Sequence, residues 1–227
     1  VTKRAFDLAA SVLGVIVISP LLLLLTIAIM LTSTGPVLFR QERVGRGGKT
    51  FKMIKFRSMV PNAEELLERL LQEQRDSGNE VLFKMKNDPR VTRVGRFMRK
   101  YSLDELPQLW NVLKGDMSLV GPRPESVAIV ERSYSGWMLE TLKVRPGITS
   151  PGAIFGYTHG DDLLDPADPE GSYVRCQLPA KLAIELAYIS HSNLLRDLGV
   201  IVRTGWTIVQ IALGRRRFPL PPEAADA

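Results

Sequence analysis

The chain has 227 residues, of which 45% are hydrophobic, and it carries a formal net charge of +6 with an isoelectric point near 9.6. This length suffices for one sizeable hydrophobic core, or for one core and a membrane element. The positive charge favours an anionic partner, such as a nucleic acid, an anionic membrane surface or a phosphorylated substrate. A single cysteine, Cys176, excludes an intrachain disulfide and a Cys/His metal cluster, and fits a reducing compartment.

Residues 1–35 are predicted to form a membrane element. From Leu8 to Leu31 the chain has 24 residues without a charge, and a straight helix rising about 1.5 Å per residue would cover about 36 Å, enough to cross a bilayer. Ser19 and Pro20 lie in the middle of this run. Because proline removes a backbone hydrogen bond and clashes with the preceding turn, we expect a kink or break of the helix there. A cleaved signal peptide is disfavoured by the length of the run and the lack of a small-residue cleavage site.

Basic residues flank both ends of the apolar run. They are Lys3, Arg4, Arg40, Arg43, Arg46 and Lys49. The positive-inside rule assigns both flanks to the cytoplasm, and a re-entrant helix, which enters the bilayer, bends and returns, satisfies this assignment. A kinked helix that spans the bilayer, with the second basic group serving another purpose, is an equal alternative from composition alone.

Residues 36–218 are predicted to form a small mixed α/β domain, so the fold class expected for the whole chain is α+β. Two β-like runs, 37–39 and 50–56, flank a glycine-rich segment and predict a hairpin. Lys55 and Arg57 lie at the end of the second run and are candidate phosphate-binding residues. Further along, a helix is expected to begin at Asn62, and a basic helix is expected to lead into Arg99.

The densest chemical pattern lies between Arg99 and Glu125. Asp104 and Glu105 are adjacent, and the apolar residues that follow them have the i, i+3, i+4, i+7 spacing of a helix. The sequence therefore predicts both carboxylates in the first turn of a helix, where the helix dipole favours acids. Successive helical residues point about 100° apart, so the two acids are not expected to do the same job.

Arginines in three separate motifs form a candidate phosphate clamp. Arg123 lies between Pro122 and Pro124, which predict a structural corner, and Arg145 lies in a tight Pro-Gly turn. With Arg99, these residues offer planar bidentate donors to phosphate oxygens. Mg²⁺ usually takes one or two protein carboxylates and completes its shell with water and phosphate oxygens, so the neighbouring Asp-Glu pair is a candidate metal site.

The C-terminal part is predicted to be helical and membrane-associated. After a polar loop over 159–171, helices are expected over 178–190 and 194–213. The second of these is interrupted by charges and is therefore expected to be interfacial rather than spanning. Three consecutive arginines, 215–217, suit an anionic lipid surface. Residues 219–227 are predicted to be a disordered tail.

Three other functions fit the sequence less well. Nucleic-acid binding is disfavoured because few aromatic residues interleave with the arginines and no helix-turn-helix or zinc pattern is present. A glycoside hydrolase needs two carboxylates about 5 to 10 Å apart on opposite faces of a sugar, which adjacent residues seldom provide. A membrane-anchored scaffold would leave the clustering of Arg99, Asp104, Glu105 and Arg123 unexplained.

Six motifs occur in order along residues 1–150. They are Lys3-Arg4-Ala5-Phe6-Asp7, Ser19-Pro20, Lys55-Phe56-Arg57-Ser58-Met59, Ser102-Leu103-Asp104-Glu105-Leu106-Pro107-Gln108, Gly121-Pro122-Arg123-Pro124 and Arg145-Pro146-Gly147-Ile148-Thr149. In this set and order, the chain resembles the monotopic phosphoglycosyl transferases. These are bacterial sugar transferases that start glycan assembly on polyprenol phosphate.

The resemblance implies a mechanism and a location. It implies a re-entrant membrane helix broken at Ser19-Pro20 and a Mg²⁺-dependent dyad of Asp104 and Glu105. The reaction would transfer a sugar 1-phosphate from a UDP-sugar to polyprenol (undecaprenyl) phosphate with release of UMP, as the first membrane step of exopolysaccharide, O-antigen or glycoprotein glycan synthesis. It would take place on the cytoplasmic face of the bacterial inner membrane. The resemblance assigns the attack to Asp104, which would carry the sugar phosphate covalently, and leaves Glu105 to hold Mg²⁺ or to position Asp104.

The chain departs from the family pattern after Thr149. There Ser150-Pro151-Gly152 and the polar loop replace the usual Gly-Leu-Trp-Gln-Val segment. The sequence leaves open which sugar is transferred, which glycan pathway is served and whether the chain forms a homo-oligomer. Because it begins at a valine, it also leaves open whether upstream membrane helices of longer family members have been removed.

Overall fold

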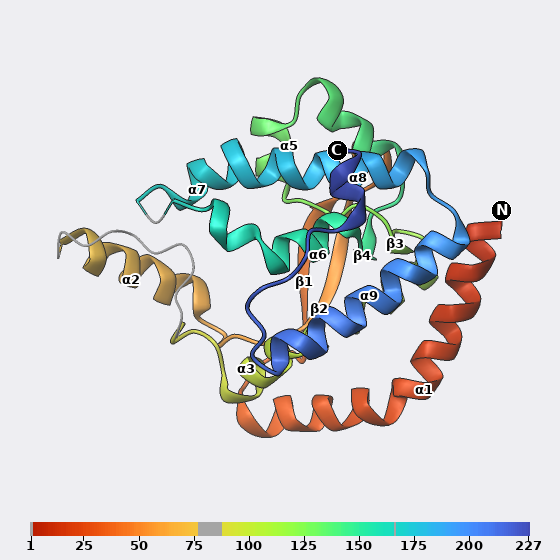
Figure 1. The fold of residues 1–227 in the computed structure, drawn as a ribbon. Helices are drawn as coiled ribbons and strands as arrows, with labels where there is room; N and C mark the ends of the chain where they lie inside the picture. The colour runs from red at the N-terminus through yellow and green to blue at the C-terminus, as the bar shows by residue number, and fades with distance from the viewer. Residues whose placement is uncertain (1, 77–87, 166) are drawn as a thin grey trace.

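The structure is a computed structural model that describes residues 2–76, 88–165 and 167–227 (Figure 1). The helices are α1 (Thr2–Thr32), α2 (Ala63–Asp76), α3 (Arg93–Lys100), α4 (Gln108–Lys114), α5 (Val127–Ser133), α6 (Pro151–Thr158), α7 (Pro169–Ser172), α8 (Leu178–Ser190) and α9 (Leu194–Ala212). The strands are β1 (Leu38–Val44), β2 (Thr50–Phe56), β3 (Ser118–Val120) and β4 (Gly147–Thr149). The predicted α+β class, with a long apolar N-terminal helix, is confirmed.

Helix α1 is continuous but bent, so that it forms two legs that meet at an angle (Figure 1). Pro20 lies inside the helix, and such a residue is a common cause of a bend. Within the described part of the chain, α1 is the one helix that is long and apolar enough to cross a membrane. Large apolar side chains on both legs are exposed, among them Val12, Leu13, Ile16, Val17, Leu23 and Leu24.

The first leg of α1 is fastened to the body by polar contacts. The buried Asp7 accepts hydrogen bonds from the Ser118 hydroxyl (2.8 Å) and from the Leu119 backbone N–H (3.2 Å). Arg4 donates to the carbonyls of Val112 (2.6 Å) and Leu113 (3.0 Å), at the C-terminal end of α4. Since cations are favoured at helix C-termini, this contact suits both elements.

The second leg is fastened by apolar packing and by one buried arginine. Leu25 and Ile29 pack with Phe56 of β2 and Met98 of α3. Beyond the end of the helix, Arg57 donates to the Ser33 carbonyl (2.9 Å) and hydroxyl (2.8 Å). Both legs therefore rest on the body, while apolar side chains along their length remain exposed.

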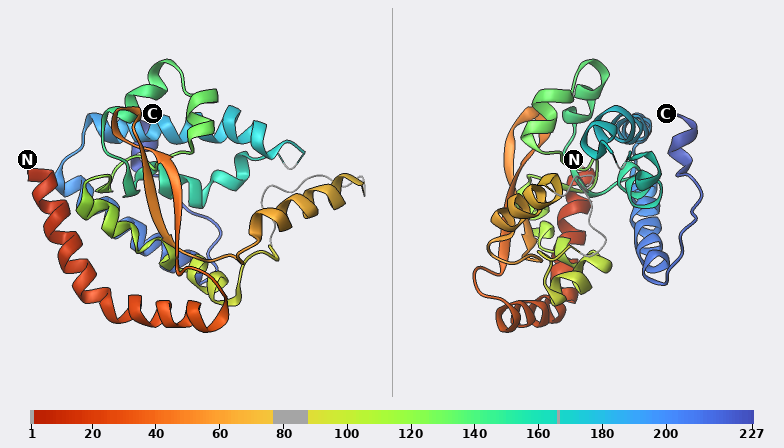
Figure 2. Two further views of the ribbon diagram at one scale, coloured as in Figure 1. Left: turned by 180° about the vertical axis from the view of Figure 1, so that it is seen from behind. Right: turned by 90° about the vertical axis from the view of Figure 1, so that its left-hand side faces the viewer.

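The sheets are small. β1 and β2 form the predicted antiparallel hairpin, with Leu38 opposite Phe56 and Val44 opposite Thr50. Seen from behind, the hairpin crosses the face of the body opposite α9 (Figure 2). β3 and β4 pair in parallel, which brings Ser118 next to Gly147. This second pairing joins the segment after α4 to the Arg-Pro-Gly turn.

The C-terminal helices cover the remaining face. Most residues of α8 that face inward are apolar, and α9 begins at Leu194, where the sequence predicts. The tail differs from the prediction of disorder for 219–227. Pro222–Ala225 forms a short 3₁₀ turn, and Glu223 accepts two hydrogen bonds from Arg203 of α9 (2.7 and 3.0 Å). Composition alone did not reveal this bidentate pair, because its two members lie 20 residues apart.

The contact between α3 and the segment after β2 leaves no room for a side chain at Gly95. A Cβ atom there would lie 1.9 Å from the Ser58 carbonyl oxygen, whereas a Cβ at Gly199, also helical, would meet nothing within 4 Å. We expect Gly95→Ala to lower the free energy of unfolding by at least about 1 kcal/mol, because overpacking outweighs the gain in helix propensity. Gly199→Ala should leave it unchanged or raise it by up to about 1 kcal/mol. Denaturant unfolding in detergent would measure both, and equal effects would contradict this packing.

Candidate functional site

The acid pair lies on a sharp turn between α3 and α4. Ser102 adopts a left-handed conformation (φ 54°), and Leu103–Glu105 then form one 3₁₀ turn. The two acids thus lie in this 3₁₀ turn and not in the first turn of α4, as the apolar spacing predicted. Pro107 explains the difference, because α4 begins only after it, at Gln108. A left-handed non-glycine residue is uncommon and costs roughly 1 to 3 kcal/mol, and such residues cluster at functional sites.

Glu105 is the centre of a half-buried cluster of charges. Its Oε2 accepts from Nη1 of Arg123 (3.1 Å), and its Oε1 accepts from Nη2 of the same guanidinium and from Nζ of Lys55 (3.0 Å). Burial by itself raises the pKa of Glu105, but the charges and hydrogen bonds of Arg123 and Lys55 outweigh burial and lower the pKa to about 2. Glu105 therefore stays ionised at any physiological pH.

Asp104 has a different environment. Burial, and then the negative charge of Glu105, raise the pKa of Asp104 above its ordinary value, while Lys55 and Arg99 partly offset the shift. Among the described residues, no side chain donates a hydrogen bond to its carboxylate. Two adjacent acids therefore have opposite pKa shifts, which is the arrangement expected where they have separate tasks.

The predicted corner presents Arg123 to Glu105. The Pro122 carbonyl accepts from the Gly147 N–H (3.0 Å), and the Glu125 carbonyl accepts from the Val44 N–H (3.0 Å). The side chain of Glu125 is buried and pairs with Lys181 of α8 (2.8 Å). β1, β4 and α8 thus hold the corner from three sides and fix the position of the arginine.

The other predicted clamp residues are only partly brought together. Arg99 lies near the dyad, and its Nε donates to the Ser58 hydroxyl (2.9 Å). Lys55 contacts Glu105, as described above. Arg57 does not reach the dyad in this arrangement, because its guanidinium is buried against Ser33.

Arg145 lies apart from the acid pair. Its Nε donates to the Gly115 carbonyl (3.0 Å), just after the C-terminal end of α4, whereas Glu105 precedes the start of this helix. Seven residues of helix separate the two positions, which corresponds to roughly 10 Å of helix rise. Arg145 was predicted to join Arg99 and Arg123 in one phosphate clamp, because the sequence does not reveal the direction in which α4 runs.

A largely apolar cavity of about 550 Å³ opens beside Glu105. Glu105, Ser102 and Tyr157 supply polar groups to its wall. The rest of the wall is mostly apolar and comes mainly from α1, α4, α9 and the paired strands β3 and β4, including Phe6, Leu109, Leu198 and Ile201. The Arg123 guanidinium lies 5.9 Å from the centre of the Tyr157 ring. A charged cluster and an apolar cavity therefore share one wall.

Sequence reasoning missed Tyr157, Ser102 and the cavity residues of α9. Tyr157 lies in α6, within the segment where the chain departs from the family pattern, and no spacing rule links it to Arg123. The apolar residues of α9 were assigned to a membrane interface, and some of them instead line the cavity. The unusual segment after Thr149 was the one available signal for Tyr157.

The donor atoms fit a divalent cation only in part. No group of three or more His, Cys, Asp or Glu side chains that could hold a metal occurs among the described residues. Both oxygens of Glu105 already accept hydrogen bonds from cations, whereas the Asp104 carboxylate does not. This donor set suits Mg²⁺ held by one or two carboxylates with phosphate oxygens of a substrate completing the shell.

Comparison with known proteins gives relatives of known activity. A UDP-galactose-lipid carrier transferase of Erwinia amylovora is 46% identical over 157 residues, which cover 68% of this chain and 32% of the relative. UDP-glucose:undecaprenyl-phosphate glucose-1-phosphate transferases of Klebsiella pneumoniae and Caulobacter vibrioides are 40% and 38% identical over 207 and 205 residues. These matches cover 90% and 89% of this chain, and 39% and 67% of the relatives.

The family assignment rests on nearly the whole chain. The chain spans about a third of the length of the Erwinia relative, so the comparison concerns one part of that longer protein. The family model described as bacterial sugar transferase matches residues 1–211, which include α1, the acid pair, the Arg123 corner and nearly all of α9. The chain therefore belongs to the bacterial sugar transferase family.

Proposed function

We propose that this chain transfers a sugar 1-phosphate from a UDP-sugar to polyprenol phosphate and releases UMP. The observation that carries the proposal is the half-buried Glu105–Arg123–Lys55 cluster, with Asp104 beside it, at the wall of an apolar cavity. The names of the Klebsiella and Caulobacter relatives describe this class of reaction with UDP-glucose and undecaprenyl phosphate.

The site has an apolar part and a charged part, which suit the isoprenoid chain and the phosphate of a polyprenol phosphate. An isoprenoid chain needs an apolar cavity, and about 550 Å³ between α1, α4 and α9 offers one. The phosphate groups of both substrates need cations. Arg99 is suited to this task, because its guanidinium bonds a hydroxyl and keeps its charge for a phosphate.

The chemistry divides into two displacements at phosphorus. In the first, an Asp104 oxygen attacks the sugar-bearing phosphorus of the UDP-sugar, the bond from this phosphorus to the bridging oxygen breaks, and UMP leaves with that oxygen. In the second, a phosphate oxygen of the polyprenol phosphate attacks the same phosphorus, and the Asp104 carboxylate is released. A covalent intermediate avoids holding two anionic substrates together for direct transfer.

Glu105 acts as the fixed charge of the site. It stays ionised and holds Arg123 and Lys55 beside Asp104, so both cations are already placed when a diphosphate arrives. Asp104 is the residue that would hold Mg²⁺, since both oxygens of Glu105 already accept from cations, and the metal would neutralise charge on the diphosphate. Tyr157 fixes the other side of Arg123 through its ring.

We further propose that α1 is re-entrant and that the body lies on the cytoplasmic face of the inner membrane. The bend in α1, the exposed apolar side chains on both legs and the attachment of both legs to one body support this arrangement. The exposed apolar residues of α9 and the arginines at 215–217 are suited to the same interface.

The topology is testable in intact cells. We expect cysteines introduced singly at Lys3 and Arg46, on a Cys176→Ser background, both to resist an impermeant thiol reagent, because both positions would face the cytoplasm. Reaction after permeabilisation is the control for accessibility. Labelling of only one position in intact cells would mean that α1 spans the bilayer.

Lysine should not be able to replace the guanidinium group of Arg123. Because a lysine cannot donate to both Glu105 oxygens in one plane, we expect Arg123→Lys to lower kcat/KM for the UDP-sugar by about 100-fold or more. The matched control is Arg132→Lys, at an exposed pair with Glu170, which should keep full activity. Near-normal activity of Arg123→Lys would reduce Arg123 to a structural role.

The covalent step provides the central test of the reaction. The full chain in detergent, incubated with Mg²⁺ and a panel of UDP-sugars but without polyprenol phosphate, should gain the mass of one sugar phosphate on a peptide that contains Asp104. One equivalent of UMP should be released at the same time. Asp104→Asn should abolish both signals, since an amide is not a nucleophile of this kind. UMP release that requires the lipid, or an active Asp104→Asn variant, would overturn the mechanism.

A further inference from the structure

A second cavity, of about 250 Å³, lies at the start of α1, away from the acid pair. Basic side chains from three parts of the chain line it, namely Lys3, Arg4, Arg46, Lys143 and Arg145. Asp7 is the one acidic residue in its lining. The predicted phosphate-binding residue Arg145 thus belongs to this cavity, where the proposed reaction gives it no task.

The arginines of this cavity have no carboxylate partner among the described residues. Arg46 donates to the Lys143 carbonyl (3.1 Å), and Arg145 donates to the Gly115 carbonyl (3.0 Å). Arg4 also bonds only carbonyls among the described contacts. Because a carbonyl carries no net charge, these bonds hold the guanidinium groups in place without neutralising them.

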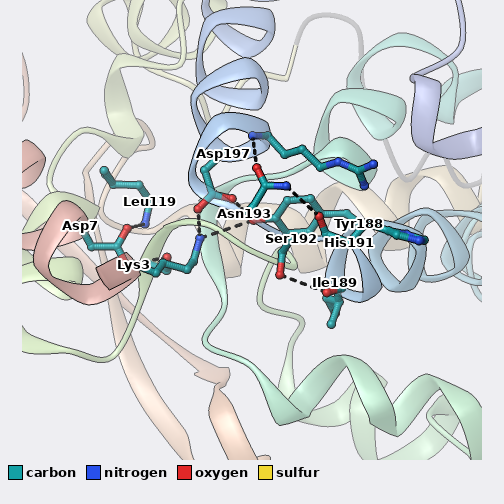
Figure 3. A network of polar contacts seen from close by, with 11 residues as sticks. Lys3, Asp7, Leu119, Tyr188, Ile189, His191, Ser192, Asn193 and Asp197 are labelled. Atoms are coloured by element: carbon teal, nitrogen blue, oxygen red, sulfur yellow. Dashed lines mark hydrogen bonds and ion pairs between the residues drawn. The ribbon is translucent and has the colours of Figure 1, made fainter. Parts of the chain in front are cut away.

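The acids near the cavity do not balance its cations. Lys3 reaches from α1 to Asp197 of α9, which also accepts from the Tyr188 hydroxyl (Figure 3). Lys143 pairs with Glu140 at the surface, and Asp7 is engaged with Ser118 and Leu119. Even with all three acids counted against the five cations, an excess of two positive charges remains.

The position of the cavity indicates what kind of anion it meets. Lys3 and Asp7 line it from the first two turns of α1, and the exposed apolar surface of the same helix begins at Leu8 and Val12. The cavity therefore lies where the apolar part of α1 gives way to charge, which in a bilayer is the depth of the lipid headgroups. Tyr188 lies in its wall as well.

We propose that this cavity binds the phosphate-bearing headgroup of an anionic phospholipid. Arginine forks and a lysine are suited to a phosphodiester, and their excess charge is suited to an anionic headgroup over a zwitterionic one. The site differs from the acid pair, because Arg4 and Arg145 bond carbonyls at the far end of α4. The proposal does not depend on the transfer reaction.

The experiment uses the full chain in a neutral detergent. Its thermal unfolding midpoint is measured against increasing dihexanoyl-phosphatidylglycerol, dihexanoyl-phosphatidylcholine or inorganic phosphate, and the shift gives each dissociation constant. The test variant is Arg46→Gln with Lys143→Gln, at the rim of the cavity. The control variant is Arg132→Gln with Arg175→Gln, which removes two cations from exposed ion pairs elsewhere.

We expect phosphatidylglycerol to bind more tightly than phosphatidylcholine and inorganic phosphate. The cavity variant should bind it about 30-fold more weakly, since each cation near an anionic headgroup contributes roughly a factor of five. The control variant should bind it normally, and both variants should release UMP from the UDP-sugar at the wild-type rate.

Four results would overturn the proposal. If phosphatidylcholine bound as tightly as phosphatidylglycerol, the cavity would be an acyl-chain site. If inorganic phosphate bound as tightly as phosphatidylglycerol, it would be a free-phosphate site. Unchanged phosphatidylglycerol binding by the cavity variant would exclude the cavity. A raised KM for the UDP-sugar in that variant would assign the cavity to the substrate instead. Because lipid binding and UMP release are measured separately, a failure of one proposal is distinguishable from a failure of the other.

Discussion

The bidentate pair between Glu105 and Arg123 is the interaction on which the site depends. It joins the 3₁₀ turn after α3 to the corner after β3, and Lys55 adds the end of β2. A half-buried ion pair of this kind contributes little net stability, because the cost of taking both charges out of water offsets their attraction. Removing one partner is nevertheless destabilising, because it leaves the other charge without its counter-ion. The pair therefore serves mainly to fix the positions of the 3₁₀ turn and the corner, and contributes little to the stability of the fold.

This fixed charge also explains why two neighbouring acids differ. Glu105 takes the hydrogen bonds of both cations, and its negative charge then raises the pKa of Asp104. An isolated acid in the same turn would attract Arg123 and Lys55 to itself. By engaging those donors, Glu105 leaves the carboxylate of Asp104 available for a substrate.

The sequence predicted the helices and strands more accurately than the contacts between them. Helix α8 and the β1–β2 hairpin follow from hydrophobic spacing and glycine-rich turns, and both were confirmed. The roles of Arg57 and Arg145 depended on distances across the fold. Arg57 turns back to Ser33, and Arg145 turns to the far end of α4. The contact of Tyr157 with Arg123 and the pairing of Glu223 with Arg203 follow no spacing rule in the sequence, because the fold alone makes these residues neighbours.

The attachment of α1 at both legs has a consequence for the height of the reaction above the bilayer. Asp7 ties the first leg to β3, and Ile29 ties the second to the β2–α3 layer. With both legs fastened, the body cannot rise or tilt independently of the helix. Once α1 is seated in lipid, the depth of Asp104 is set by the chain itself. A bilayer of another thickness would then shift the phosphate of the proposed lipid acceptor relative to a stationary carboxylate, so hydrocarbon thickness becomes a physical variable of the proposed transfer step.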